Sequence, residues 1–443
     1  MQQLEAGQEL LTWLRDAGGL VHPALELRMD EDTGLSAFTS REVGAAEQLI
    51  SCPFDLAITI EVATGAICSI YGIQESELHE WNERMRIVTY LVLHHVHSGS
   101  SDWPEALGHL KYVNSLPSAD LLLTPLHYSE PELELLQGTN MYGAIEAQRA
   151  LWKSESERIN EAVKDPRLTW DLYLLSATHY QSRAFPSRLL KLATTSTYVN
   201  AIPEPSTEDE SYPMLLPGVD IFNHARGQPV TWLSTSIPSA EGSCPSVVVL
   251  DRGGIREGVQ VFNNYGPKSN EEFLFSYGFV LDPNPDDTVT LKVSSGGMTP
   301  EGEARLKERR LDANRKFVLR LDSPVPQDLL RMLRVVLGEE VEVDNNGEDE
   351  DDLHAEHERE VKTVELELDV LGLLGSMLED KLAKLPPMKE DSTGVREEVA
   401  RMCRVYVQGQ SDILSNTITT VIDKIDQLEN MLDQGMGECP CCS

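Results

Sequence analysis

Two short segments constrain this chain more than any other feature of its sequence. The first is Pro217-Gly218-Val219-Asp220-Ile221-Phe222-Asn223-His224, and the second, about forty residues later, is Val261-Phe262-Asn263-Asn264-Tyr265-Gly266. Taken singly they say little, because Asn-His pairs are common in turns and an aromatic residue near a strand end usually belongs to a core. Their joint order and spacing carry the information.

Size and composition predict a globular protein. The chain has 443 residues, of which 41% are hydrophobic, so it can bury a full core and divide into roughly two or three domains. It contains no run of about 18 apolar residues, and its N-terminus lacks a basic segment followed by an apolar one. We therefore expect no membrane span and no signal peptide, and an intracellular location, either cytoplasmic or nuclear.

The charge of the chain limits its partners. The formal net charge is -36, which would repel a phosphate backbone, so nucleic-acid binding is not expected. A basic protein substrate would instead be attracted to such a surface. The seven cysteines are an odd number and do not suit a disulfide framework, so a reducing compartment fits best.

The first two thirds of the chain alternate between strand and helix patterns. Leu10, Leu11, Trp13 and Leu14 predict an opening helix that ends at Gly18-Gly19. Residues 32–61 read as turns and strands of a small β-fold, and residues from about 75 to 165 as a helical insert. Strand character returns later, where Asp251-Arg252-Gly253-Gly254 predicts a hairpin between residues 247–250 and 259–262.

The last third is predicted to be helical. Apolar residues recur at helical spacing over 361–378 and again over 414–432. Between Glu339 and Glu360 the chain has twelve acidic residues and one arginine, which predicts an extended, solvated loop or, alternatively, a docking strip for a lysine-rich partner. Cys439, Cys441 and Cys442 lie in a terminal tail, and neither they nor the His94, His95 and His97 group predict a metal site.

The two opening segments resemble the heart of the SET domain, and the continuation from Pro267 to Val280 resembles the Rubisco methyltransferase branch of that family. The resemblance implies an α+β fold in which a split, β-rich SET domain carries a helical insert and is followed by an all-helical C-terminal domain. The domains would be a SET domain at 1–290, with its insert at about 75–165, a helical substrate-binding domain at 300–432, and a cysteine-containing tail at 433–443. It also implies S-adenosylmethionine as the cofactor.

Candidate site residues follow from the same resemblance. Tyr265 would be the catalytic tyrosine at the methyl-transfer channel, and Arg183 would hold the carboxylate of the cofactor, because a guanidinium can grip a carboxylate with two donors. The remaining cofactor-binding residues would be Asp220, Asn223, His224, Tyr277 and Phe279. The residues that contact the substrate would be Ser182, Phe185 and Tyr277.

The first cofactor loop departs from the pattern of the family. Where a Gly-x-Gly turn is usual, this chain has Glu31-Asp32-Thr33-Gly34 and keeps only the second glycine. Backbone contacts from Glu31, Asp32 and Thr33 to the cofactor remain feasible, because Asp is tolerated in tight turns.

The implied activity is methylation of a lysine in a protein substrate, with a monomer favoured. A lysine nucleophile must lose its proton, and a narrow apolar channel disfavours the charged form. Two alternatives stay open, a protein-histidine methyltransferase and a catalytically weak binding module. An imidazole nucleophile would need a polar partner to fix its tautomer, whereas Phe185 offers only an apolar wall, so lysine is favoured.

Overall fold

A computed structural model describes residues 2–191, 211–239, 242–293, 299–338, 353–387 and 393–436. The chain divides into two compact units. The first comprises residues 1–127 and 146–267, and the second comprises residues 128–145 and 268–443. A segment from the first half of the sequence therefore folds with the C-terminal part.

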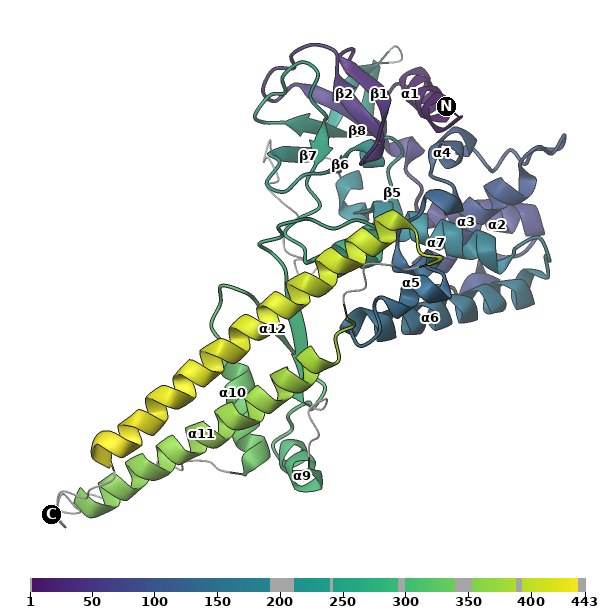
Figure 1. Ribbon diagram of the computed structural model, residues 1–443. Coiled ribbons are helices and arrows are strands. Elements are labelled where there is room, and N and C mark those ends of the chain that lie inside the picture. The colour runs from purple at the N-terminus through teal and green to yellow at the C-terminus, as the bar shows by residue number, and fades with distance from the viewer. Residues whose placement is uncertain are drawn as a thin grey trace. The chain divides into compact units, whose positions relative to one another are not determined.

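The strands of the first unit form several small sheets (Figure 1). A three-stranded antiparallel sheet has the order β3-β8-β7, β1 pairs with β2, and β4 pairs with β5. The bounds of these strands are β1 Leu25–Asp30, β2 Gly34–Thr39, β3 Gln48–Pro53, β4 Ala184–Pro186, β5 Pro213–Leu215, β7 Val230–Ser239 and β8 Gly242–Asp251. The last pair, β6 (Asn223–His224) and β9 (Phe262–Asn263), is parallel.

Apart from the first helix, the helices of the first unit lie in the sequence between β3 and β4. In Figure 1, α2, α3 and α7 lie beside one another, and α3 packs against both of the others. Thr59, Asn82 and Thr169 cap these three helices through side chains that accept a backbone N–H. The helix bounds are α1 Gln2–Asp16, α2 Ile60–Tyr71, α3 Glu83–His97, α4 Leu110–Ser115, α6 Asn140–Val163 and α7 Trp170–Arg183. The first six residues of α6, Asn140 to Ile145, belong to the second unit.

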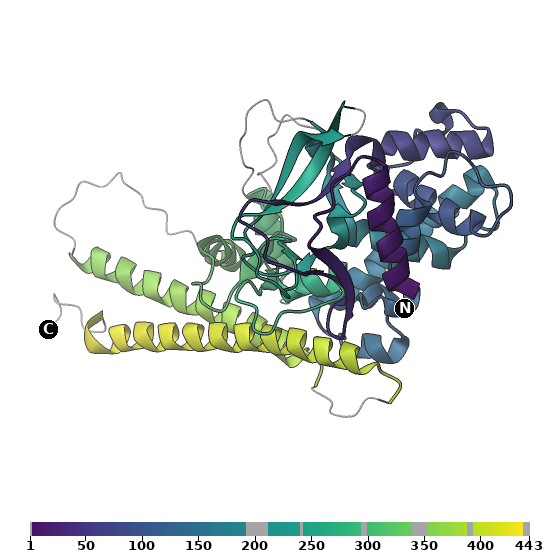
Figure 2. The ribbon, with the colours of Figure 1, turned by 90° about the horizontal axis from the view of Figure 1, so that it is seen from above.

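The second unit is built around two long helices. Helices α11 (Leu353–Ala383) and α12 (Glu397–Met431) run side by side in opposite directions, as both views show (Figures 1 and 2). Their apolar faces enclose Leu374, Leu378 and Leu414, which are fully buried. The other elements are α5 Glu130–Glu134, α8 Asn270–Tyr277, α9 Pro300–Glu308, α10 Gln327–Leu337, and the strands β10 Val289–Lys292 and β11 Lys316–Leu319.

The structure confirms the predicted fold class, the opening helix and both C-terminal helices. Within the helical C-terminal part it adds one strand, β11, which pairs with β10. Of the acidic run, residues 339–352 lie outside the described residues, as does the tail from residue 437. From Leu353 the run is helical rather than extended.

The predicted hairpin across residues 251–254 is wrong. Strand β8 pairs instead with β7 and β3, while residues 259–261 hydrogen-bond to β2, where the Val261 N–H donates to the Ala37 carbonyl over 2.8 Å. The glycine turn explains the difference. Gly254 has a φ of +73°, and a Cβ there would lie 3.1 Å from the carbonyl oxygen of Val43, so the chain turns closely over residues 43–45 and away from β8.

None of the described helices is long and apolar enough to cross a membrane.

An ion pair joins the segment 128–145 to the start of α12. Glu132 also completes a capping box with Ser129 at the start of α5, and its carboxylate accepts from Arg396 at 2.7 and 3.0 Å. Burial alone would raise the pKa of Glu132, but the hydrogen bonds from Arg396 and Ser129 outweigh it and lower that pKa to about 2. Because the pKa of Glu132 is lower in the folded protein than in the unfolded chain, its ionised carboxylate stabilises the fold at pH values above the unfolded pKa. This stabilisation is lost as the pH falls towards the folded pKa.

We expect Glu132→Gln to lower the free energy of unfolding at pH 7 by about 1.5–3 kcal/mol, because a charge-assisted bond is lost. The difference from the wild type should shrink by roughly 1 kcal/mol between pH 7 and pH 4, as the unfolded wild type takes up a proton. Urea unfolding at several pH values measures this. The exposed Glu134→Gln on the same helix is the control, and a difference that does not change with pH would contradict the role of Glu132.

Candidate active site

The two motif segments meet in the parallel pair of β6 and β9. Asn223 lies opposite Phe262, and His224 lies opposite Asn263. The Ala225 N–H continues the pairing by donating to the Asn263 carbonyl over 2.9 Å. Strands of two residues have little stability by themselves, so their side-chain contacts must hold the crossing in place.

Tyr265 is fixed to the first segment at both of its ends. Its hydroxyl donates to the Phe222 carbonyl over 2.9 Å, and its backbone N–H donates to Nδ1 of His224 over 3.0 Å. The rings of His224 and Tyr265 stack with centroids 5.2 Å apart. The bond to Tyr265 also assigns Nδ1 of His224 as an acceptor, so the neutral ring carries its proton on Nε2.

The turn between β1 and β2 lies against Asn223. The Asp30 carboxylate accepts the backbone N–H groups of Asp32 and Thr33 at 3.0 and 2.9 Å, which closes the turn. Gly34 follows with a φ of +68°, a conformation that glycine adopts without strain. Asp30 thus holds the turn at the place where the family pattern has its first glycine.

The side-chain amide of Asn223 ties this turn to β6. It donates to the Ser36 hydroxyl over 2.8 Å and to the Thr33 carbonyl over 3.4 Å. Ser36 is fully buried, and its hydroxyl also meets that of Thr33 at 2.8 Å. Asn223 therefore positions the backbone of residues 31–33. The side chains of Glu31 and Asp32 are exposed and take no part in this contact.

Arg183, at the end of α7, forms an ion pair with Asp220, whose side chain is buried while that of Arg183 is partly exposed. One guanidinium nitrogen, Nη1, donates to both the carboxylate and the carbonyl of Asp220 at 3.1 Å. The same carboxylate accepts from the Tyr112 hydroxyl at 2.9 Å and from the Gly218 N–H at 3.1 Å. Burial opposes the charge of Arg183, but the Asp220 carboxylate outweighs it and raises the pKa of the guanidinium.

A second donor of Arg183 is left for another partner. Its Nε is buried and has no hydrogen-bond partner among the described residues. A buried donor without an acceptor costs about 1–3 kcal/mol, so such a group is a natural place for a ligand.

The remaining predicted residues are Ser182, Phe185, Tyr277 and Phe279. The hydrogen bonds described for Ser182 and the ring contact described for Phe185 are to residues outside the two motif segments. Ser182 donates its hydroxyl to the Thr178 carbonyl of its own helix over 2.9 Å. Phe185 is buried and packs edge-to-face on Trp232, with ring centroids 5.2 Å apart. Tyr277 and Phe279 belong to the second unit, so their role beside Tyr265 stays a prediction, as do the roles assigned to the other site residues.

Three residues of this site were missed by the sequence analysis, namely Asp30, Ser36 and Tyr112. Asp30 had a signal, since an aspartate side chain commonly accepts the backbone N–H two residues later and so opens a turn. Ser36 and Tyr112 had none, because their partners Asn223 and Asp220 lie far away in the sequence. Among the described residues no group of His, Cys, Asp and Glu could hold a metal ion.

Known proteins share both the sequence and the fold. Residues 300–414 match the family described as Rubisco LSMT substrate-binding. A ribosomal lysine N-methyltransferase of Schizosaccharomyces pombe is 33% identical over 294 residues, covering 65% of this chain and 48% of that protein. An actin-histidine N-methyltransferase of Gallus gallus is 25% identical over 341 residues, covering 76% of this chain and 53% of that protein. The chain thus spans about half the length of the curated relatives it matches.

Solved structures agree with this. The SET domain of LSMT bound to lysine and AdoHcy has a TM-score of 0.66 at 18% identity, and the match covers 98% of this chain and 96% of that one. Rubisco LSMT bound to AdoMet has a TM-score of 0.67 at 17% identity, with 97% and 96% covered. The fold is that of a SET-domain protein, and the chain is homologous to SET-domain methyltransferases. Its match to the Rubisco LSMT substrate-binding family and its likeness to LSMT structures agree with the branch that the sequence resembles.

The hydroxyl of Tyr112 donates to the Asp220 carboxylate that also pairs with Arg183. Removal of this hydroxyl tests how much the bond contributes to stability. We expect Tyr112→Phe to lower the free energy of unfolding by about 0.5–1.5 kcal/mol, the usual worth of one hydrogen bond. Urea unfolding measures this. Tyr142→Phe is the control, because the Tyr142 hydroxyl makes no hydrogen bond to any described residue. Equal stability of the Tyr112→Phe variant and the wild type would contradict the contact.

Proposed function

We propose that this protein is an S-adenosylmethionine-dependent lysine N-methyltransferase that acts, as an intracellular monomer, on a basic protein. The observation that carries the proposal is the hydrogen bonding of Arg183. Its Nη1 donates to Asp220, whereas its buried Nε has no acceptor among the described residues and can donate to a ligand. Asn223 and Tyr265 lie in the same compact unit and on the two crossing segments. The relative that is 33% identical is a lysine methyltransferase.

The residues present fit S-adenosylmethionine. The Nε of Arg183 would donate to its carboxylate, in a charge-assisted bond. The backbone of Glu31, Asp32 and Thr33, held by Asp30 and Asn223, would contact it from the other side. The missing first glycine of this turn does not favour a binding module without activity, because Asp30 closes the turn in its place.

When bound, S-adenosylmethionine would supply a methyl group on a positively charged sulfur. A neutral amine would take this group in an in-line displacement, in which the C–S bond breaks, S-adenosylhomocysteine leaves and the methylated amine can release a proton to water. Such a reaction requires alignment more than acid or base strength. Tyr265 would provide the alignment, since the bond from its hydroxyl to the Phe222 carbonyl fixes the position of the phenol, and a phenol oxygen can also accept from an amine. Phe185 and Trp232 form an apolar surface that favours a neutral amine over its charged form.

The preferred substrate is a lysine within a basic protein, such as a component of the ribosome. The net charge of -36 would speed the encounter with a basic partner, and this attraction should weaken as salt is added. Histidine is the second candidate, because actin-histidine methyltransferases are 25% identical to this chain. Mass spectrometry of a protein extract that has reacted with the enzyme and isotope-labelled cofactor separates methyl-lysine from methyl-histidine, and labelled histidine alone would refute the lysine assignment.

We expect Tyr265→Phe to lower the rate constant of methyl transfer by about 100-fold or more, because a misplaced nucleophile reacts that much more slowly. Binding of S-adenosylhomocysteine, measured by calorimetry, should stay nearly unchanged. Tyr71→Phe, which removes a hydroxyl that donates to Asp165 instead, is the matched control. Turnover of the Tyr265→Phe variant at the wild-type rate would remove Tyr265 from the mechanism.

Arg183→Lys retains a positive charge near Asp220 but lacks the second donor, so we expect it to bind S-adenosylhomocysteine more weakly by about 1–3 kcal/mol. Asn223→Ala should weaken binding to a similar degree, because the turn at residues 31–33 loses its support. Calorimetry measures both, with Arg167→Lys as the control, since Arg167 pairs with Asp165. Unchanged affinity in both variants would mean that the cofactor binds elsewhere.

A further inference from the structure

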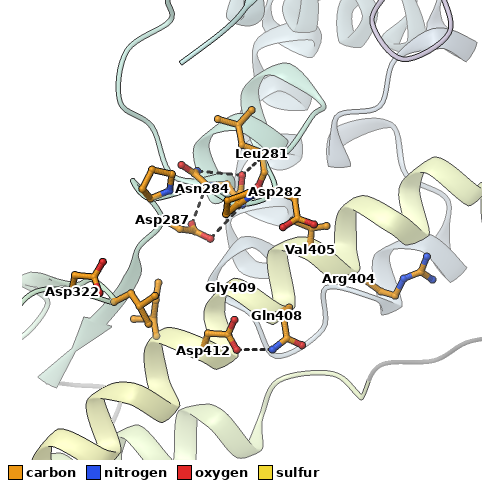
Figure 3. Close-up of a pocket in the computed structure, with 15 residues that line it drawn as sticks. Leu281, Asp282, Asn284, Asp287, Asp322, Arg404, Val405, Gln408, Gly409 and Asp412 are labelled. Atoms are coloured by element: carbon orange, nitrogen blue, oxygen red, sulfur yellow. Dashed lines mark hydrogen bonds between the residues drawn. The ribbon is translucent and has the colours of Figure 1, made fainter. Parts of the chain in front are cut away.

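The second unit contains a pocket of about 350 Å³ that the proposed methyl transfer does not use (Figure 3). It is bounded by the segment from Asn270 to Asp287, by Leu321 and Asp322 after β11, and by one face of α12. All of these residues belong to the second unit, whereas Arg183 and Tyr265 belong to the first. The volume lies within the range of about 300–1,000 Å³ found for sites that bind small groups.

A buried carboxylate forms one wall of this pocket. Asp287 is 8% exposed, and its Oδ1 accepts the N–H groups of Asn270 and Thr288, both at 3.0 Å. From the part of the chain that the structure describes, its Oδ2 accepts the Asn270 side-chain amide alone, at the long distance of 3.4 Å. Burial raises the pKa of Asp287 in spite of these donors, because it disfavours the charged carboxylate. A cation beside Oδ2 would therefore stabilise the ionised form of Asp287.

The helix that faces Asp287 has no side chain at the nearest position. A Cβ on Gly409 of α12 would lie 2.4 Å from Oδ2 of Asp287, which is far inside a normal contact. Glycine is unfavourable within a helix by roughly 1 kcal/mol relative to alanine. Its presence here allows the backbone of α12 to lie close against the Asp287 carboxylate, which a side chain at this position would displace.

The rim of the pocket is acidic and its walls are partly apolar. Asp282, Asp322 and Asp412 are exposed at the rim, and Arg404 is the one cation among the lining residues. Leu281, Pro283, Pro285, Leu321 and Ile413 supply the apolar part of the lining. This combination suits a side chain with a long aliphatic stem and a charged end, which can pack the stem on carbon and direct the charge to carboxylates.

We propose that this pocket binds a lysine or arginine side chain of the protein substrate, at a residue other than the one that is methylated. The inference rests on the proposed function for the identity of the partner, but the pocket's preference for a basic side chain is independent of catalysis. Its carboxylates would select the substrate by charge, and the buried Asp287 would fix the bound side chain.

A fluorescein-labelled, amidated tri-arginine peptide tests the pocket by fluorescence anisotropy on the full-length protein. The double variant Asp322→Asn with Asp412→Asn should bind this peptide about 5- to 10-fold more weakly than the wild type, because two nearby charges are lost. The control is Asp423→Asn with Asp426→Asn, which removes the same charge from exposed positions of α12 outside the pocket. It should bind within about twofold of the wild type.

Gly409→Ala provides a second measurement, since its methyl group would clash with Oδ2 of Asp287, displace the carboxylate and so weaken binding of the peptide. The two double variants change only exposed side chains, so they decide the outcome even if Gly409→Ala does not fold. Equal loss in both double variants, or no loss in the Asp322 and Asp412 pair, would overturn the proposal.

Binding of S-adenosylhomocysteine and methyl transfer to extract proteins are measured on the same variants. If no protein is methylated by the wild type but the peptide binds as expected, the proposed function fails and the pocket assignment stands. If methylation is intact and the two double variants lose the peptide equally, only the pocket assignment fails.

Discussion

The candidate site depends on the hydrogen bonds that the buried carboxylate of Asp220 accepts. A buried carboxylate must receive hydrogen bonds, because its desolvation is otherwise too costly. Asp220 receives them from Tyr112 on α4, from Arg183 at the end of α7 and from the N–H of Gly218. One side chain thereby fixes two helices and the motif segment. It also determines which nitrogen of Arg183 is occupied and which remains for a ligand.

How much of this was predictable follows from the distance along the chain between interacting residues. The order of the segments 217–224 and 261–266 was sufficient to identify the family, and the apolar periodicity of α11 and α12 to place both helices. These signals are local. The choice of partner for β8 is not, since β-branched residues favour a strand without specifying its neighbour. The hairpin prediction failed there, and the contact between Tyr112 and Asp220, 108 residues apart, had no local signal either.

The altered turn at residues 30–34 illustrates how a motif can change its residues and keep its geometry. The usual first glycine permits a tight turn by tolerating an unusual backbone conformation. Here Asp30 binds the backbone N–H groups of residues 32 and 33, which favours a turn by hydrogen bonding instead. In this chain the position of the backbone relative to Asn223 is thus set by a side chain that accepts two backbone N–H groups.

The second unit consists of two separate stretches of sequence. Tyr128–Ile145 folds with residues 268–443, where Glu132 pairs with Arg396 and Asn140 accepts from Lys381 over 2.7 Å. A fragment that starts at residue 268 would lack both partners and would leave Arg396 and Lys381 without them. The C-terminal helices are consequently not a module that recombination could exchange between relatives at one junction. Substitutions at the contacts of α11 and α12 would instead have to be matched by substitutions in the segment 128–145, which precedes these helices by more than a hundred residues.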